Sequence, residues 1–158
     1  IALREVDYKT VLALIDYIYR ATIDINNDSV ESIFSTASLF EMLEVCQLCA
    51  NHMMQELDIT NCVGVYQFGS YHQNTTLKQA GLTYIHNYFN DLSQGDDLLT
   101  LTCSDLEEVI TDDNLNVMRE ESVFELIIKW VNADRESRIK SLPCLFKHIR
   151  VPLINQVI

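Results

Sequence analysis

Cysteine and histidine residues gather at one place in this chain where they could ligate a metal ion. Cys46, Cys49 and His52 lie close together, and Cys62 is a possible fourth ligand. Two cysteines separated by two residues form half of a common zinc site. Against zinc, the first three fall in one predicted helix and no second Cys/His pair follows. Both cysteines also share the apolar stripe of that helix, where cysteine packs as a small hydrophobic residue. We therefore expect core cysteines and no metal or other cofactor, with zinc as the alternative.

No other group of residues has the spacing of a catalytic site. A nucleophile needs a neighbouring base, but the histidines are scattered without a flanking signature, at His52, His72, His86 and His148. The glycine-rich motifs that hold nucleotide phosphates are absent. The acidic run from Glu107 to Asp113 lacks the alternating ligands and central glycine of a calcium loop. We interpret it as a solvated helix face and its exit turn. The pattern favours a non-catalytic binding module.

The composition is that of an acidic globular chain. Of 158 residues, 48% are hydrophobic and 22% charged, and the formal net charge is −12. The 11 basic residues are scattered, so we expect no nucleic-acid partner, whereas a basic protein would suit the acidic surface. No apolar run approaches the roughly 18 residues that cross a bilayer, so we expect no membrane partner.

Two further features concern the cell compartment and the extent of the chain. The five cysteines are odd in number and irregularly spaced, which favours reduced thiols in a cytoplasmic protein, with the nucleus as a further possibility. The chain starts at Ile1 and enters an apolar pattern directly. We interpret it as a fragment of a longer protein.

Hydrophobic residues recur at helical spacing along most of the chain. The stripes are Val11, Leu14, Ile15 and Ile18; Val30, Ile33, Phe34 and Ala37; Met42, Val45, Cys46, Cys49 and Met53; and Leu77, Ala80, Gly81, Tyr84, Ile85, Tyr88, Phe89 and Leu92. Asp28, with Glu31 three residues later, predicts the start of the second helix. Residues 2–6 and 22–25 are the only plausible strands. The sequence therefore predicts a mainly all-α fold with a small β element at its start. A helical repeat is the alternative, but no fixed period supports it.

The second half of the chain carries start signals for further helices. Two capping boxes pair Ser104 with Glu107 and Ser122 with Glu125. Pro143 suits the first turn of a last helix, where its missing N–H costs nothing. Trp130 lies beside a stripe that contains Phe124 and Ile127, so we expect a core anchor rather than an interaction hot spot.

The first third of the chain resembles the C-terminal part of a BTB domain. Residues 14–19, with the sequence LIDYIY, are similar to a helix of that family that ends in tyrosine, and residues 30–37 to the helix that follows. Val45 and Cys49 are similar to the next helix. After the tyrosine the family usually has a small residue and glycine, where this chain has arginine and alanine. The resemblance assigns residues 1–57 to a BTB domain.

From residue 58 the chain resembles a BACK domain, the helical module that follows BTB in kelch-like proteins. Residues 61–63 are similar to its opening helix and residues 84–89 to its second. Residues 115–138 are similar to its middle, and residues 149–153 to its close. These pieces follow in order over nearly the whole chain, which is identified as a member of the kelch-like family. The resemblance implies a helical BACK bundle over residues 58–158, preceded by the α/β end of a BTB domain.

The resemblance implies an adaptor without catalytic residues. In kelch-like proteins the BTB domain forms a homodimer and binds the N-terminal region of cullin-3 in a RING ubiquitin ligase. The first two BACK helices, the 3-box, extend that contact, and a downstream kelch domain holds the protein substrate. Carried over by position, the cullin-binding residues would be Phe40, Glu41, Met42, Leu43, Tyr66 and His72. The groove along residues 61–72 would be the 3-box contribution.

Alternatives remain for both the residues and the function. Packing between helices is the alternative role of Phe40 and Met42, and a helix N-cap is the expected role of Asn61. The alternative function is a self-associating BTB-BACK scaffold that organises cytoskeletal or transcriptional partners without cullin. An enzyme of an unrelated helical family is a third hypothesis.

Overall fold

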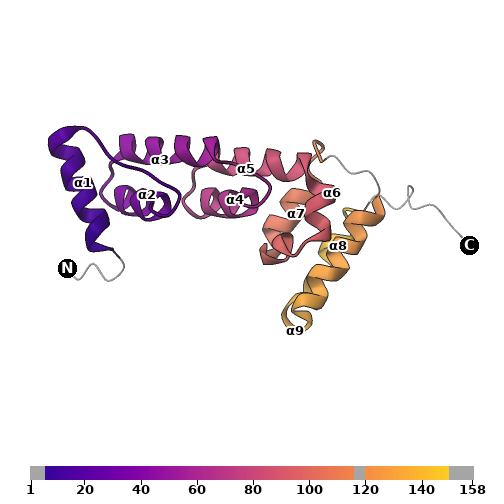
Figure 1. The fold of residues 1–158 in the computed structure, drawn as a ribbon. Helices are drawn as coiled ribbons and strands as arrows, with labels where there is room; N and C mark the ends of the chain where they lie inside the picture. The colour runs from indigo at the N-terminus through magenta and orange to yellow at the C-terminus, as the bar shows by residue number, and fades with distance from the viewer. Residues whose placement is uncertain (1–5, 116–119, 150–158) are drawn as a thin grey trace, which may run out of the picture.

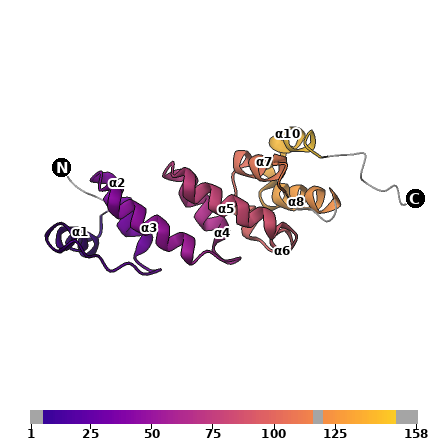
Figure 2. The same cartoon turned by 90° about the horizontal axis from the view of Figure 1, so that it is seen from above.

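The computed structural model describes residues 6–115 and 120–149, which form an elongated row of helices with α1 and α10 toward opposite ends (Figures 1 and 2). None of the described helices is both long and apolar enough to cross a membrane. In the first half, α3 and α5 form one layer and α2 and α4 the layer beneath it (Figure 1). The helices are α1 (Tyr8–Arg20), α2 (Val30–Leu39), α3 (Leu43–Gln55), α4 (Cys62–Tyr71), α5 (Thr75–Asn87), α6 (Phe89–Gln94), η1 (Asp97–Thr100), α7 (Cys103–Thr111), α8 (Glu120–Ala133), α9 (Arg135–Arg138), η2 (Ile139–Ser141) and α10 (Leu142–Phe146), where η marks a 3₁₀ helix.

The predicted β element is wrong where the structure describes it. Residues 22–25 form an irregular connection between α1 and α2, and residues 2–5 of the other predicted strand lie outside the described residues. A strand needs a neighbouring strand for its backbone hydrogen bonds, and the described residues contain none. Ile23 and Ile25 instead pack against the core around α2 and α3. The fold is mainly all-α, as predicted, but its described first third is helical rather than α/β.

Buried apolar side chains form two cores. The first core contains Leu14, Val30, Ile33, Phe34, Ala37, Val45, Cys49, Ala50, Met53 and Leu77. The second, larger core contains Cys62, Val63, Tyr66, Leu82, Ile85, Phe89, Leu92, Leu98, Leu101, Leu106, Val109, Ile110, Val123, Leu126, Ile127, Trp130, Val131, Leu145 and Ile149. Helix α4 contributes to both, because Val65 and Phe68 pack against the first core. Its Val63 and Tyr66 belong to the second. The α4–α5 hairpin therefore joins the two halves.

The α4–α5 hairpin is held by backbone contact. A Cβ atom added at Gly81 of α5 would lie 2.7 Å from the backbone nitrogen of Tyr66 on α4. One added at Gly69 of α4 would collide with the backbone of Lys78 on α5. Only glycine, which has no Cβ, permits so close an approach. The two glycines therefore fix the distance between the helices.

The stripe predicted as one helix over residues 77–92 is divided between two helices. Helix α5 ends at Asn87, Tyr88 has φ −112° and ψ 21°, and α6 begins at Phe89. Phe89 and Leu92 of the stripe lie in the second core, whereas Tyr88 at the break is 42% exposed. The break lets α6 turn with that core, which a straight continuation of α5 would leave.

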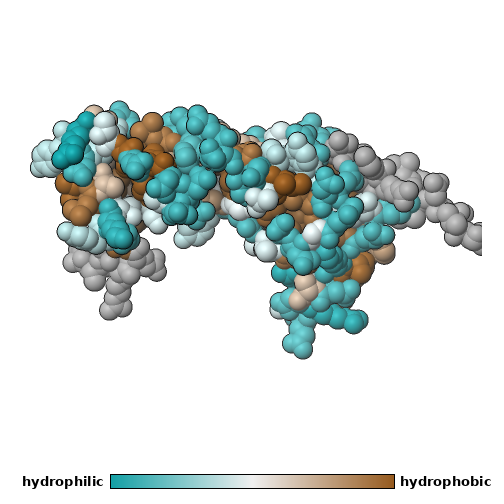
Figure 3. All heavy atoms as spheres, viewed as in Figure 1, coloured by the Kyte–Doolittle hydropathy of each residue, from teal (hydrophilic) through white to brown (hydrophobic). Residues whose placement is uncertain are grey.

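The stripes of the first helices are buried to different extents. The predicted stripe of α2 is buried in full, and in α3 Val45 and Cys49 are buried. In α1 only Leu14 of the predicted stripe is buried, and Ile15 and Ile18 are exposed. Apolar side chains accordingly reach the surface at this end of the molecule (Figure 3). The pattern predicted the helix correctly, but not which side would be covered.

The start of α7 differs from the predicted capping box. The cap is Thr102, whose Oγ1 accepts the Asp105 N–H at 3.2 Å and donates to the Asp105 carboxylate at 2.7 Å. Ser104, the predicted cap, lies inside the helix, and Glu107 contacts α10 and the residues just after it instead. Threonine and an acid three residues apart satisfy the same pattern two residues earlier.

Other helix starts show similar shifts. Ser29 rather than Asp28 precedes α2, and Ser122 lies inside α8 rather than before it. Asn61 occupies the N-cap position of α4, but its side chain bonds the preceding turn and not the helix. Pro143 lies in the first turn of α10, as predicted. Polar residues that cluster before a helix compete for the cap, so the pattern locates a start only to within two residues.

Trp130 is the predicted core anchor. Its ring is buried, and Nε1 donates to the Leu101 carbonyl at 2.9 Å. The guanidinium of Arg138 lies 4.3 Å from the ring centroid, and its Nη1 donates to the Trp130 carbonyl at 2.9 Å. Phe124, predicted to share the core stripe, is instead 39% exposed. The preceding residue, Val123, faces the core in its place.

A candidate protein-binding groove

A groove runs between α2 and α4. It consists of two adjoining cavities of about 440 Å³ and about 180 Å³. Both are lined by Glu31 of α2 and Phe68 of α4. The first cavity extends along α2 toward the end of α4, and the second extends toward α3 and the start of α4. We refer to the two together as the α2–α4 groove.

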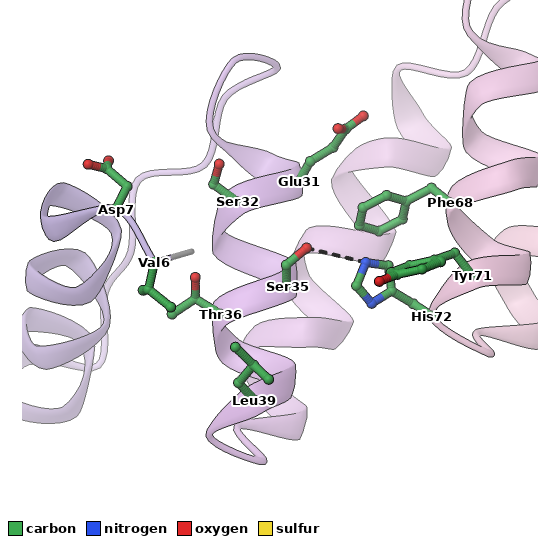
Figure 4. A pocket seen from close by; sticks show the side chains of 10 residues that line it. All are labelled: Val6, Asp7, Glu31, Ser32, Ser35, Thr36, Leu39, Phe68, Tyr71 and His72. Carbon is green, nitrogen blue, oxygen red and sulfur yellow. Dashed lines mark hydrogen bonds between the residues drawn. The ribbon is translucent and has the colours of Figure 1, made fainter. Parts of the chain in front are cut away.

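Aromatic rings line the first cavity. His72, which follows α4, lies with its ring centroid 4.3 Å from that of Phe68. Its Nε2 is 3.2 Å from the Ser35 hydroxyl of α2, and this hydrogen bond bridges the two helices (Figure 4). Burial lowers the pKa of His72, while the nearby Glu31 carboxylate opposes that shift. The imidazole is therefore mainly neutral at neutral pH.

The second cavity combines polar groups with an apolar wall. Nε2 of His52, on α3, is 2.8 Å from Oδ1 of Asn27 in the turn before α2. Glu56 follows α3 and places a second carboxylate beside Glu31 in the lining of this cavity. Val65 of α4 lines the cavity and packs against the first core. An extended polypeptide could find both apolar contact and hydrogen-bonding groups here.

The groove region is acidic and contains no compensating cation of its own. Residues 21–77 include no lysine or arginine, and their acidic residues are Asp24, Asp28, Glu31, Glu41, Glu44, Glu56 and Asp58. Among the described residues, none forms a hydrogen bond or ion pair with the exposed Glu31 carboxylate. Unpaired carboxylates in a concave surface give a negative potential that attracts cationic groups.

The turn between α2 and α3 exposes apolar side chains next to the groove. Phe40 is 46% exposed and Leu43 is 77% exposed. Leu39, at the end of α2, lines the first cavity, so the patch and the groove adjoin. Glu41 has a left-handed φ of 56°, which is unfavourable for a residue other than glycine. The half-buried Met42 donates its N–H to a carbonyl of α2 at 2.8 Å and closes the turn.

Tyr66 lies away from the groove, in the second core. It is 0% exposed, and its hydroxyl donates to Glu108 at 2.9 Å and to Asp105 at 3.3 Å, both on α7. Burial, followed by the contacts with these carboxylates, raises the pKa of the phenol. No surface of Tyr66 is left for a partner to touch, so its predicted role is corrected here. The groove face of α4 carries Val65, Phe68 and Tyr71 instead.

The remaining predicted contact residues lie around the groove. Phe40, Glu41 and Leu43 are exposed in the turn, and Met42 is half-buried beneath them. His72 lies in the first cavity, which Leu39 connects to the turn. Their contact with a partner stays a prediction. Packing between helices accounts for part of Met42, whereas Phe40 leaves 46% of its surface exposed.

The sequence reasoning assigned no residue of α2 to the groove, which is lined by Val30, Glu31, Ser32, Ser35, Thr36 and Leu39 of that helix. Glu31, Ser35 and Leu39 follow each other at intervals of four and so share one face of the helix. This face lies beside the buried stripe. The sequence signal for a binding surface there was a leucine, Leu39, on the same helix face as a glutamate, Glu31. Nothing within α2 indicates that α4 lies next to it, because that neighbour is a tertiary contact.

The cysteines considered as metal ligands lie in or beside the cores. Burial raises the pKa of Cys49 to about 12 and that of Cys62 to about 11. The half-buried Cys46 has its Sγ 3.8 Å from the Phe34 carbonyl. Within residues 6–115 and 120–149, no three metal-ligating side chains converge on one point. A thiol in such an environment stays protonated and packs as an apolar group.

Comparison with known proteins identifies the family. Residues 1–57 match the model of the BTB/POZ domain, and residues 62–158 match that of BACK, described as "BTB And C-terminal Kelch". The chain therefore belongs to the kelch-like family of BTB-BACK proteins. The division predicted at residue 58 stays a prediction, and the two matches meet near it.

Named relatives cover nearly the whole chain. Kelch-like protein 3 of Danio rerio is 34% identical over 157 residues, which are 99% of this chain and 26% of the relative. Kelch-like protein 3 of Homo sapiens is 34% identical over 154 residues, which are 98% of this chain and 26% of that relative's length. Kelch repeat and BTB domain-containing protein 12 of Homo sapiens is 31% identical over 155 residues, which are 98% of this chain and 25% of that relative's length. The chain spans about a quarter of the length of these relatives.

Proposed function

We propose that this chain is the cullin-binding part of a non-catalytic substrate adaptor for a cullin-3 RING ubiquitin ligase. Membership of the kelch-like family supports an adaptor. The observation that carries the proposal is the exposed apolar turn at Phe40 and Leu43, which adjoins the α2–α4 groove. Such a patch beside a concave surface is typical of a protein-binding site.

In this proposal the turn and the groove form one interface. The N-terminal region of cullin-3 covers Phe40 and Leu43, and its flanking residues continue into the groove toward His72. Burying a large apolar side chain contributes about 1.5–3 kcal/mol, so these two side chains form the energetic centre. The protein substrate binds a kelch domain elsewhere in the full protein, homodimerisation occurs through the BTB domain, and the adaptor works in the cytoplasm.

Affinity capture tests the proposal directly. The full protein is immobilised, and the purified cullin-3 N-terminal region is titrated over it. We expect saturable binding at submicromolar to micromolar concentration. The absence of binding at micromolar cullin would exclude the adaptor function.

Substitution of the exposed aromatic locates the interface. Phe40→Glu places a charge in the proposed apolar centre, and we expect capture to weaken at least tenfold, about 1.4 kcal/mol, with an unchanged circular-dichroism helix signal. Phe124→Glu is the matched control, because Phe124 has similar exposure, at 39% against 46%, but lies on α8. Loss of helicity in Phe40→Glu would show instead that Phe40 is a packing residue.

A second candidate function is a self-associating scaffold that does not bind cullin. The outer surface of α1 favours it, because Tyr8, Ile18 and Tyr19 are all exposed there. Sedimentation of the full protein with and without Ile18→Asp separates the two. A self-associated protein that this substitution dissociates, and that captures no cullin, would support the scaffold.

A further inference from the structure

The unpaired charge of the α2–α4 groove is placed where its two cavities meet. Glu31 lines both cavities together with Phe68. The close-up shows the two side chains near each other, one from each helix (Figure 4). An apolar ring and a carboxylate with no ion-pair partner among the described residues therefore stand together where the two cavities meet, so an occupant that extends through both would contact them.

Carboxylates continue along the groove on both sides of that point. Asp7 lines the first cavity and Glu56 the second. The titratable groups that face them are His72 and His52, and burial lowers the pKa of His72, which keeps it uncharged at neutral pH. The lining of described residues contains no lysine or arginine. An anionic segment would be repelled here, whereas a cationic one would find an unused partner.

We propose that Glu31 is the specificity-determining residue of the groove and selects a polypeptide segment that presents lysine or arginine next to an apolar side chain. The cation pairs with the Glu31 carboxylate, and the apolar side chain packs on Phe68. The proposal rests on the proposed function insofar as the segment belongs to the cullin-3 N-terminal region.

The dimensions of the groove suit a short extended segment. The groove face of α2 runs from Glu31 to Leu39, and eight residues of helix extend about 12 Å. An extended chain advances about 3.3 Å per residue, so about four residues of the partner would lie along it. Side chains of an extended segment alternate between its two sides. A cation can therefore face Glu31 on α2 while the neighbouring apolar side chain faces Phe68 on α4.

The test compares Glu31→Gln with a matched substitution outside the groove. Glu136→Gln removes the same charge from an exposed position on α9. Capture of the cullin-3 N-terminal region by the full protein is measured for both variants at low and high salt. For Glu31→Gln we expect about a three- to fivefold loss of affinity, the range of a partly screened ion pair. That loss should fall mainly on the association rate and flatten the salt dependence.

Charge reversal sharpens the same test. Glu31→Lys should weaken capture more than tenfold, because repulsion replaces attraction, and the circular-dichroism signal should not change since the side chain is exposed. Glu136→Gln should bind as the unchanged protein does. Equal weakening by Glu31→Gln and Glu136→Gln would mean that only the overall acidic charge attracts the partner, and would overturn the proposal.

Peptide probes separate this inference from the proposed function. Two fluorescent synthetic peptides share their leucines and differ only in carrying lysines or glutamates between them. We expect the full protein to bind the lysine peptide, Glu31→Gln to weaken it three- to fivefold, and the glutamate peptide not to bind. If cullin is not captured but these results hold, the proposed function fails and the role of Glu31 stands. If cullin binds and no measurement responds to Glu31, the role of Glu31 is excluded and the proposed function stands.

Discussion

The two halves of this molecule use charged residues differently. Every ion pair between described residues joins positions from 78 onward, among them Lys78–Glu108 at 2.8 Å and His148–Glu107 at 2.7 Å. Within the described residues before Lys78 there is none, although the acids there outnumber the cations. The same half also exposes Phe40 and Leu43. Ion pairs therefore connect elements of the second half, whereas the acids of the first half form none among the described residues.

Helix α7 is the centre of the polar contacts in the second half. Its Glu108 accepts from Tyr66 of α4, Glu107 accepts from His148 after α10, and the Val109 carbonyl lies 3.1 Å from Nε2 of His86 on α5. Exposed ion pairs contribute little stability each, so they orient helices that the apolar core already holds. The difference leaves the acids of the described first half available for the contact proposed above, whereas those of the second half help to orient its helices.

The largest effect on the difference between the two halves is expected when the buried anchor of the second core is removed. Trp130→Ala deletes a buried ring, its hydrogen bond to Leu101 and the stacking surface of Arg138. We expect the free energy of unfolding to fall by roughly 3–5 kcal/mol, as for other truncated core aromatics. Urea denaturation measures this loss when unfolding is monitored by the circular-dichroism helix signal, which does not require the deleted tryptophan. A loss well under about 1 kcal/mol would contradict the burial of this ring.

A smaller effect is expected at the junction of the halves. Gly81→Ala forces a methyl group to within 2.7 Å of the α4 backbone, and we expect a loss of about 1–3 kcal/mol from overpacking. Gly64→Ala on α4 is the matched control, because nothing lies within 4 Å of the added Cβ. That change should stabilise by about 0.5–1 kcal/mol, since alanine favours helix more than glycine does. Changes of the same sign in both variants would argue against close helix contact.

The smallest effect concerns pH and the contact between Glu107 and His148. The hydrogen bond from His148 is the main cause that lowers the pKa of Glu107 below its ordinary value of 4.5. A carboxylate with a lowered folded pKa contributes stability above its unfolded pKa and loses it as pH falls through the folded pKa. His148→Ala should therefore make the loss of stability below pH 4.5 less steep. His52→Ala, whose ring contacts the Asn27 amide rather than an acid, should leave that slope unchanged.

Local patterns predicted the buried face of α2 well, because this helix packs against both α1 and α3. Val30, Ile33 and Phe34 are buried as their spacing requires, because α2 lies directly on the first core. The prediction for α1 was incomplete, since Ile15 and Ile18 follow the same spacing and are exposed. Periodicity shows that a helix has an apolar side, but only its neighbours decide how much of that side is covered.

Only the α4 side of the groove was predicted, because its two walls are far apart in the sequence. Ser35 and His72 are 37 positions apart and meet only because α4 lies beside α2. Tyr66 was misassigned for a related reason, since one residue of rotation along α4 separates the groove side chain Val65 from the buried phenol. A helix turns about 100° per residue. Assigning a helical segment to a groove therefore does not show which of its side chains point into that groove.

The contact through Gly69 and Gly81 has a mechanical consequence. Side chains between helices can rearrange, but two backbones in contact leave no compressible layer. Because α4 also contributes to both cores, a displacement of this helix would change the packing of both. The hairpin is therefore a closely packed connection between the two cores.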